Sequence, residues 1–371
     1  MVTYAAATSA PEDYNENSAH RLKDIDEHGE LLRELALRTF HIAETPKVAD
    51  FGCGPGLCSL KAVRPVLETW AGEAPRKQLS ACFADLPGND WGVLRETVFG
   101  QQGLVSGHNV PQIEMLAGDF YNQMLSGESV SLAISFFATH WLRNPVYLQS
   151  QNAFWFSDLQ AHQYQRLRQV AMADFALFVK KRVNELVPGG SLLVSTLGSS
   201  SAETAPNGIV PSNNVVVPFT REVLQDMVAD GILDQVFLNN FLFPVWYLTK
   251  EDARQAILQN EELAASCDIE LVQVRSRSRE DSDPYARFLD QPEVYARKKT
   301  LSDRAILQTT LEENVFRRCV QSPEELRQLS EEFFARMERA ILSDVLAGPY
   351  RRHIERKRIL TVVLRKKLMT C

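Results

Sequence analysis

One short stretch constrains the fold of this 371-residue chain more than any other, the sequence VADFGCGPGLCSL at residues 48–60. A short apolar run ends at Asp50, glycines follow at Gly52, Gly54 and Gly56, and a helical pattern begins directly afterwards. Glycine tolerates positive φ and lets the backbone approach a ligand closely. A strand, a glycine turn and a helix in this order indicate an α/β sheet with a ligand beside the turn.

The apolar pattern around this turn predicts a mostly parallel sheet covered by helices on both faces, because strand-like runs alternate with helical patterns up to about residue 200. The predicted strands lie at 47–51, 79–84, 113–118, 129–137 and 191–198. The predicted helices lie near 57–69, 89–99 and 158–187, and a further helix at about 18–43 precedes the first strand.

The pattern becomes mostly helical after a polar loop at 199–214. We expect helices around 219–230, 249–265, 301–320 and 323–346, and two more strands at 269–275 and 358–366. The predicted organisation is an N-terminal segment at 1–46 over the ligand, the main sheet at 47–200 with an insertion at about 142–165, a helical cap at 201–350 and a final strand within 351–371.

The composition excludes several classes of protein. Hydrophobic residues make up 45% of the chain, and the net charge is −7 with 40 basic and 47 acidic residues, which argues against nucleic-acid binding. The six cysteines form no C-x-x-C pair, so no metal site or disulfide framework is predicted. With no signal-peptide pattern and no apolar run approaching 18 residues, we expect a cytoplasmic protein that does not bind membranes.

The glycine turn does not fit a dinucleotide. The dinucleotide fingerprint needs a third glycine at the position of Leu57, and Pro55 lacks an amide N–H that would cradle a pyrophosphate. A nicotinamide oxidoreductase is therefore disfavoured, and a ligand without phosphates is favoured.

S-adenosylmethionine is such a ligand, and three acids at predicted strand ends suit its parts. Asp50 is placed to accept a hydrogen bond from the ammonium, and Asp85 from the ribose hydroxyls. Asp119 could accept from the adenine amino group, and Phe120 could stack on the ring.

Several motifs that occur in order extend this interpretation. They are YNENS (14–18), ADLPGNDWGVL (84–94), GDFYNQML (118–125), THWL (139–142) and FALFVKKRVNELVPGGSLLVSTLG (175–198). Together they resemble the SABATH methyltransferases, plant-type enzymes that methylate salicylate, benzoate, jasmonate and related acids, or xanthine nitrogens. The resemblance implies a class I methyltransferase fold, Rossmann-like with seven mostly parallel strands, an α-helical cap and a homodimer.

The resemblance also implies roles for individual residues. Cofactor-contacting positions of the family are matched by Tyr14, Ser18, Asp50, Asp85, Leu86 and Phe120, and we count Ser135 and the three glycines of the turn with them. Trp141 matches the tryptophan that donates its indole N–H to the substrate carboxylate. Two positions depart from the family, which has glutamine where this chain has Arg21 and usually serine where it has Asp119, and the shorter turn leaves the family's asparagine without a clear counterpart.

A carboxylate substrate explains why no catalytic base is expected, because it is already ionised at neutral pH. Arg21 and Trp141 are predicted to hold one substrate carboxylate together, or Arg21 holds a second acidic group. The alternative is that Arg21 forms a surface ion pair with Asp24 or Glu27.

The rest of the substrate pocket is predicted from aromatic residues. His140 is either a pocket donor, which we favour, or a core histidine. The candidate walls are Phe154, Trp155, Phe156, Phe241, Phe243, Trp246 and Tyr247, of which Phe243 and Trp246 are the predicted substrate contacts.

The sequence thus predicts an S-adenosylmethionine-dependent enzyme that forms the methyl ester of a small-molecule carboxylic acid and releases S-adenosylhomocysteine. An N-methyltransferase of a small heterocycle is the first alternative, against which Arg21 argues because a guanidinium repels a developing positive charge. A non-catalytic cofactor-binding partner subunit is the second, against which the three intact acids argue.

Overall fold

The structure of the protein is a computed structural model. It describes residues 19–104, 110–144, 153–200, 204–205, 208–209, 219–239, 241–277, 283, 285–348 and 357–368.

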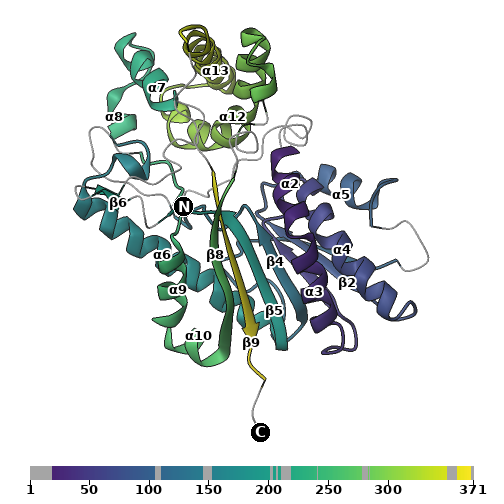
Figure 1. The fold of residues 1–371 in the computed structure, drawn as a ribbon. Helices are drawn as coiled ribbons and strands as arrows, with labels where there is room; N and C mark the ends of the chain where they lie inside the picture. The colour runs from purple at the N-terminus through teal and green to yellow at the C-terminus, as the bar shows by residue number, and fades with distance from the viewer. Residues whose placement is uncertain are drawn as a thin grey trace.

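A seven-stranded sheet forms the centre of the molecule (Figure 1). The strands lie in the order β3–β2–β1–β4–β5–β9–β8, and all but β9 run in the same direction. Their bounds are β1 (Lys47–Phe51), β2 (Ser80–Asp85), β3 (Gln112–Ala117), β4 (Val130–Phe136), β5 (Leu186–Leu197), β8 (Cys267–Ser276) and β9 (Arg358–Lys366). The predicted mostly parallel sheet is confirmed, and β6 (Thr204–Ala205) and β7 (Gly208–Ile209) form a separate two-stranded sheet.

The order of the strands creates the crevice that a ligand can use. The chain proceeds from β1 outward to β2 and β3, and then returns to β4 on the other side of β1. In open α/β sheets, ligands bind beyond the carboxyl ends of the strands where the order reverses. The glycine turn follows β1 directly and therefore lies at this point.

Helices cover both faces of the sheet (Figure 1). On one side lie α2 (Ala19–Glu27), α3 (Gly29–Thr39), α4 (Leu57–Glu73) and α5 (Trp91–Phe99), and on the other α6 (Ala161–Glu185), α9 (Lys250–Leu258) and α10 (Glu261–Ser266). Alternate residues of β1 serve the two apolar cores, since Val48 packs toward α2–α4 while Ala49 and Phe51 pack toward α6. Strands buried on both faces read as continuous apolar runs, which is why they were predictable.

The predicted helix at 18–43 is wrong in one respect, because it is divided into α2 and α3 at His28. The His28 ring bonds with Nδ1 to the Asp24 carbonyl at 2.6 Å and with Nε2 to the Thr361 hydroxyl of β9 at 3.0 Å. This contact ties the break in the helix to a strand that is 333 residues away in the sequence.

Strand β5 begins five residues before the predicted start at residue 191. Leu186 already pairs with Val130, and the register then shifts so that Ser191 lies opposite Leu132. Gly189 lies between these two pairings and has φ +81°. The Pro-Gly-Gly sequence therefore forms an irregularity inside β5, whereas the predicted start at residue 191 treated it as a turn before the strand.

The cap lies beyond the carboxyl ends of the parallel strands (Figure 1). It contains α7 (Thr220–Ala229), α8 (Gln235–Asn239), α12 (Pro292–Asn314) and α13 (Pro323–Leu346), with short 3-10 turns at Phe156–Asp158, Ala286–Phe288 and Phe316–Arg318. The predicted helix at 323–346 is confirmed, whereas α12 starts nine residues before its predicted start, with Pro292 in its first turn.

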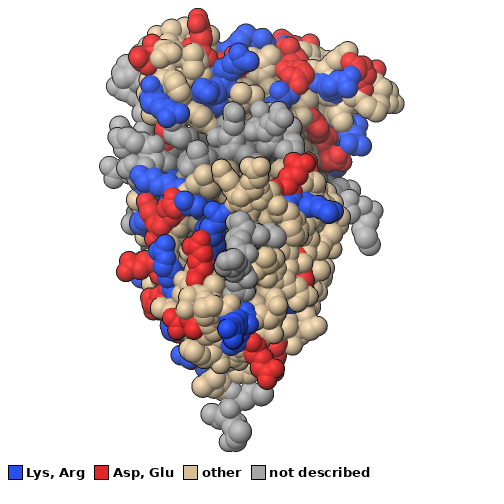
Figure 2. Space-filling model, turned by 90° about the vertical axis from the view of Figure 1, so that its right-hand side faces the viewer, with Lys and Arg blue, Asp and Glu red and all other residues tan. Residues whose placement is uncertain are grey.

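The surface carries charges of both signs. Figure 2 shows lysines and arginines interspersed with acidic residues on the face seen there, without a continuous basic stripe. None of the helices in the described part of the chain is both long and apolar enough to cross a lipid bilayer. Within the same residues, no group of three or more His, Cys, Asp or Glu side chains is arranged to hold a metal ion.

Candidate functional site

The glycine turn is packed so closely that a residue with a side chain would not fit at Gly52. Gly52 has φ +87°, and a β-carbon built on it would lie 2.3 Å from the Ala138 β-carbon. Its amide donates to the Ala84 carbonyl at 2.8 Å, so the turn continues the ladder between β1 and β2. Gly54 and Gly56 also have positive φ, at 55° and 98°. The ends of β1 and β2 and the segment after β4 therefore meet at the turn.

Asp50 is a buried carboxyl group with one satisfied oxygen. It is 2% exposed, and the Ser59 hydroxyl donates to its Oδ2 atom. Among the described residues, its Oδ1 atom is buried and has no hydrogen-bond partner. The pKa of Asp50 is raised to about 7, chiefly by burial; the hydrogen bond from Ser59 opposes this shift, and the charge of Asp85 adds to it. An ammonium group beside Oδ1 would offset this desolvation.

Asp85 holds the glycine turn from the neighbouring strand. It accepts hydrogen bonds from the backbone amides of Gly54 at 2.6 Å and Leu86 at 2.7 Å. The Asn89 side chain donates to the Gly54 carbonyl at 2.9 Å. Two residues of the DLPGND motif, Asp85 and Asn89, thus bind the amide and the carbonyl of Gly54. Burial raises the pKa of Asp85, and the two amides oppose this effect. Asn89 and Ser59 were not among the predicted site residues, although both lie in quoted stretches, Ser59 in 48–60 and Asn89 in 84–94.

The loop after β3 carries Asp119 and Phe120. Asp119 accepts from the amide of Tyr121 at 2.8 Å, which fixes the bend of the loop. The half-buried Phe120 ring packs on the edge of Phe178 at 5.2 Å, and its Cε1 atom lies 3.7 Å from the β-carbon position of Gly52. The loop and the glycine turn are thus neighbours.

The segment after β4 carries Trp141 at the rim of the sheet. Its carbonyl accepts from the Tyr121 hydroxyl at 2.8 Å, and its backbone pairs with Val245. The half-exposed indole has no hydrogen-bond partner for its N–H within the described residues. Ser135, earlier in β4, is fully buried and donates to the Phe51 carbonyl at 2.7 Å, so its hydroxyl ties β4 to β1.

Aromatic residues of the cap cover Trp141 from one side. Phe243 is fully buried, with its ring 5.5 Å from the Trp141 ring and 4.8 Å from the Trp155 ring. Trp246 packs instead on Tyr164 of α6 at 4.6 Å. Of the two predicted substrate contacts, Phe243 is therefore the one that adjoins Trp141.

His140 is buried, with its ring 5.8 Å from the Trp141 ring and 6.0 Å from the Tyr247 ring. Its Nδ1 atom shares a hydrogen bond of 2.9 Å with the Thr196 hydroxyl. Burial, and secondly the charge of Arg21, lower the pKa of His140 to about 3, so the ring is neutral at physiological pH. The Arg21 guanidinium lies 5.9 Å from the ring centre of Phe137.

The structure brings Arg21 close to the segment that bears Trp141, since Phe137, whose ring it approaches, lies four residues before Trp141. The acids considered as its surface partners form other ion pairs, Asp24 with Arg277 at 2.9 Å and Glu27 with Arg275. Tyr14 and Ser18 lie outside the described residues.

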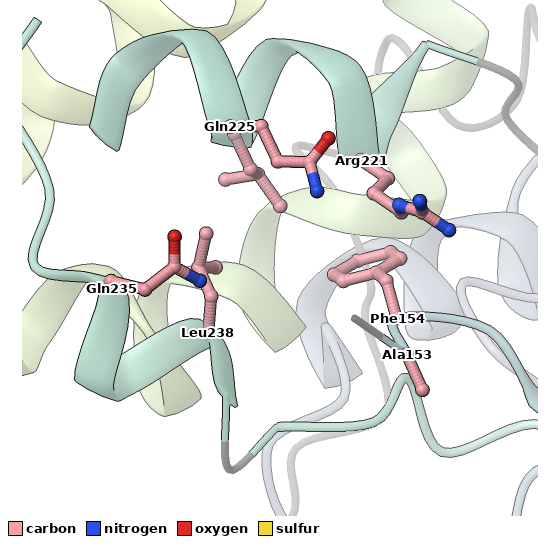
Figure 3. A pocket seen from close by; sticks show the side chains of 7 residues that line it. Ala153, Phe154, Arg221, Gln225, Gln235 and Leu238 are labelled. Carbon is pink, nitrogen blue, oxygen red and sulfur yellow. The ribbon is translucent and has the colours of Figure 1, made fainter. Parts of the chain in front are cut away.

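An open pocket lies between α7, α8 and the segment at 153–154, and its volume of about 290 Å³ includes space that is open to solvent (Figure 3). The sequence did not predict it. Its lining combines a cation, two amides and apolar groups, namely Ala153, Phe154, Arg221, Leu224, Gln225, Gln235 and Leu238. The Phe154 ring also contacts Phe243 at 5.9 Å, so the pocket lies beyond the aromatic wall beside Trp141.

Comparison with known proteins decides the family. The chain matches, over residues 4–367, the family described as SAM dependent carboxyl methyltransferase. The chain belongs to this family. The resemblance to the SABATH methyltransferases is thereby confirmed, and the cofactor of the family is S-adenosylmethionine, as predicted.

The individual members of the family that resemble this chain share only a low sequence identity with it. The O-methyltransferase acrG of Aspergillus aculeatus is 28% identical over 219 residues, which is 59% of this chain and 56% of that protein. The loganic acid O-methyltransferase of Catharanthus roseus is 23% identical over 269 residues, or 67% and 70% of the two chains. The chain thus spans little more than half the length of acrG.

The fold also matches a solved structure, a loganic acid methyltransferase with SAH, with a TM-score of 0.72. The superposition covers 97% of this chain and 98% of the loganic acid methyltransferase chain. Its sequence identity of 19% means that the match shows the fold alone. The predicted class I methyltransferase fold is confirmed by it.

Proposed function

We propose that this chain is an S-adenosylmethionine-dependent methyltransferase that forms the methyl ester of a small-molecule carboxylic acid. The match to the carboxyl methyltransferase family over residues 4–367 carries the proposal. The arrangement of the carboxyl edge of the sheet supports it, because acids, a glycine turn and an indole donor converge there.

The described residues fit the cofactor. Asp50 has a buried oxygen that lacks a partner within the described residues, and this oxygen suits the ammonium end. Asp85, at the end of β2, suits the ribose hydroxyls, and Asp119 and Phe120 suit the adenine. The glycine turn would accommodate the close approach of the amino-acid end. When bound, the cofactor supplies an electrophilic methyl group.

The remaining cofactor contacts stay predictions from the resemblance. They are Tyr14, Ser18, Leu86 and Ser135. Of the range 201–350 that was predicted as a cap, α9, α10 and β8 belong to the sheet and the helices on its face. We propose further that the segment 1–46 covers the cofactor, that α7, α8, α12 and α13 cap the site, and that the protein is a cytoplasmic homodimer.

The substrate acid needs orientation, not activation. Its carboxylate is ionised at neutral pH, so no side chain has to remove a proton. The Trp141 indole can only donate a hydrogen bond, and it would hold one carboxylate oxygen in place. Orientation of this kind can lower a barrier by roughly 7–11 kcal/mol. Neutral His140, as a polar group, and buried Phe243, as an apolar one, would form part of the wall around that carboxylate.

Arg21 is proposed to add a charge-assisted contact to the same carboxylate or to a second acidic group of the substrate. The Arg21→Gln variant is expected to raise the KM for the acid about tenfold, because it replaces a charged donor with a neutral one. The exposed Arg33 of α3 provides the matched control, Arg33→Gln, which should leave the KM unchanged. Equal KM values in wild type and Arg21→Gln would remove Arg21 from the site.

A panel of carboxylic acids incubated with methyl-labelled S-adenosylmethionine tests the function. Ester formation gives labelled product from which mild alkali releases methanol. Label that resists alkali would indicate transfer to nitrogen. Binding of S-adenosylhomocysteine without transfer to any acid or heterocycle would indicate the partner-subunit alternative, and failure to bind it would refute the proposal.

A further inference from the structure

An ion pair without solvent exposure lies at the end of α6, between the sheet and the loop after β3. Arg182 and Glu185 are both 0% exposed. The guanidinium meets the carboxylate with two hydrogen bonds, Nε to Oε2 and Nη2 to Oε1, each 2.8 Å long. This two-pronged geometry is the strongest pairing that these side chains form.

Both members of the pair also bind the backbone of the loop at 118–125. Arg182 donates to the Phe120 carbonyl at 2.6 Å and to the Asn122 carbonyl at 2.9 Å. Glu185 Oε1 accepts from the amide of Met124 at 2.6 Å and from that of Leu125 at 3.0 Å. Four hydrogen bonds to its backbone thus hold the loop, and none of them uses a side chain of the loop.

The same guanidinium contacts the end of β1. Its central carbon lies 3.9 Å from the ring centre of Phe51 and 5.3 Å from that of Phe178. Phe51 directly precedes Gly52, and Phe178 packs against Phe120. One buried cation therefore fixes the distance between the glycine turn and the loop that carries Asp119 and Phe120.

Stability alone does not account for this arrangement. Taking two charges out of water costs several kcal/mol each, and apolar residues of similar volume are often as stabilising as a buried pair. What apolar residues cannot do is bind backbone carbonyls and amides of a loop in a set geometry. The pair is thus suited to determining where the loop lies.

We propose that Arg182 and Glu185 are positioning residues for the cofactor, which hold the adenine-contacting loop in register with the glycine turn. This inference rests on the proposed function, because the role of Asp119 and Phe120 belongs to it. Because both side chains are fully buried and bind the loop backbone, we expect their effect on cofactor binding to pass through the loop and not through direct contact.

The test uses the Arg182→Met/Glu185→Met double variant of the full chain, which removes both charges together and leaves neither buried alone. Hydrogen exchange of the Met124 and Leu125 amides should become at least about tenfold faster, because their acceptor is gone. The apparent Kd rises in proportion as the fraction of molecules with a correctly placed loop falls. If that fraction is about one in ten in the variant, the Kd for S-adenosylhomocysteine rises about tenfold. The KM for the acid should stay within about twofold.

A second ion pair on α6, in which Asp252 is buried and Arg168 is partly exposed, supplies the control. Arg168 donates from Nε to Asp252 of α9 at 2.7 Å, and Asp252, like Glu185, accepts a backbone amide, that of Thr249. The Arg168→Met/Asp252→Met variant disturbs the same helix away from the loop. Its Kd for S-adenosylhomocysteine should equal that of wild type, even if its melting temperature falls.

Two results separate the positioning role from the proposed function. If wild type fails to bind S-adenosylhomocysteine, the proposed function is refuted, and the exchange measurement still reports on the loop. If wild type binds and the Arg182→Met/Glu185→Met variant binds equally well, the positioning role is refuted. Should that variant not fold, Arg182→Lys replaces it, because lysine keeps the charge but cannot form the two parallel hydrogen bonds to Glu185. An unchanged Kd for S-adenosylhomocysteine in Arg182→Lys would also refute the positioning role.

Discussion

The buried carboxyl of Asp50 makes the stability of the protein depend on pH in a specific direction. Its pKa is raised from 3.8 to about 7, mainly by burial. In the folded protein it therefore keeps its proton up to about pH 7, whereas the unfolded chain releases it above about pH 4. Folding is then linked to proton uptake, so this contribution to stability is present below pH 4 and is lost as pH rises to 7.

The magnitude follows from the two pKa values. A displacement of about three pH units corresponds to about 4 kcal/mol when the change is complete. Between pH 5 and pH 8 the part that is lost amounts to about 3 kcal/mol. The Asp50→Asn variant cannot ionise, and its amide oxygen can still accept from the Ser59 hydroxyl, so it should lack this loss.

Thermal unfolding of both proteins from pH 5 to pH 8 measures the effect. For a chain of this size each kcal/mol shifts Tm by about 1–2 °C, so the Tm of Asp50→Asn relative to wild type should rise by about 4 °C across the range. The control is Asp26→Asn, because Asp26 is an exposed acid paired with Lys61. A difference between wild type and Asp50→Asn that stays constant with pH would refute the reasoning.

Three further predictions concern the site. Gly52→Ala should lower the free energy of unfolding in urea titrations by about 2–4 kcal/mol, because φ is +87° and the new β-carbon would lie 2.3 Å from the β-carbon of Ala138. The control is Gly72→Ala in α4, whose new β-carbon would meet no atom within 4 Å, so the free energy of unfolding should rise by up to about 1 kcal/mol. Trp141→Phe keeps the ring but loses the donor, so steady-state kinetics should show a KM for the acid raised about tenfold with an unchanged KM for the cofactor. Phe243→Ala should lower the free energy of unfolding by about 3–5 kcal/mol and let bulkier acids react in the same labelled-cofactor assay, which an unchanged substrate range would contradict.

The central sheet could be predicted from sequence because its signals are local. The strand at 47–51 and the helix at 323–346 occur where expected, the first as an apolar run before glycines and the second with Pro323 at its start and a Ser322 capping box. The break at His28 could not be predicted, because its cause is a bond to Thr361 at the far end of the chain. The early start of α12 was missed because charged residues interrupt the apolar pattern in its first turns.

The acids of the site could be located from sequence, but the surroundings of each could not. Motif position places Asp50 and Asp85 at strand ends, yet nothing local reveals that Ser59 and Asn89 bond to the acid and to the turn. The pair Arg182 and Glu185 looks in sequence like any exposed i, i+3 pair on a helix. Only the packing of α6 under the loop shows that both charges are buried.

The position of β9 has a consequence for the way the chain folds. This strand lies between β5 and β8, and it follows both of them in the chain. While the polypeptide is being synthesised, β8 has no neighbour in the sheet, and β5 exposes an unpaired edge, until residues 358–366 have emerged. Exposed strand edges invite association with other chains. Nascent chains should therefore need chaperones until β9 inserts between β5 and β8.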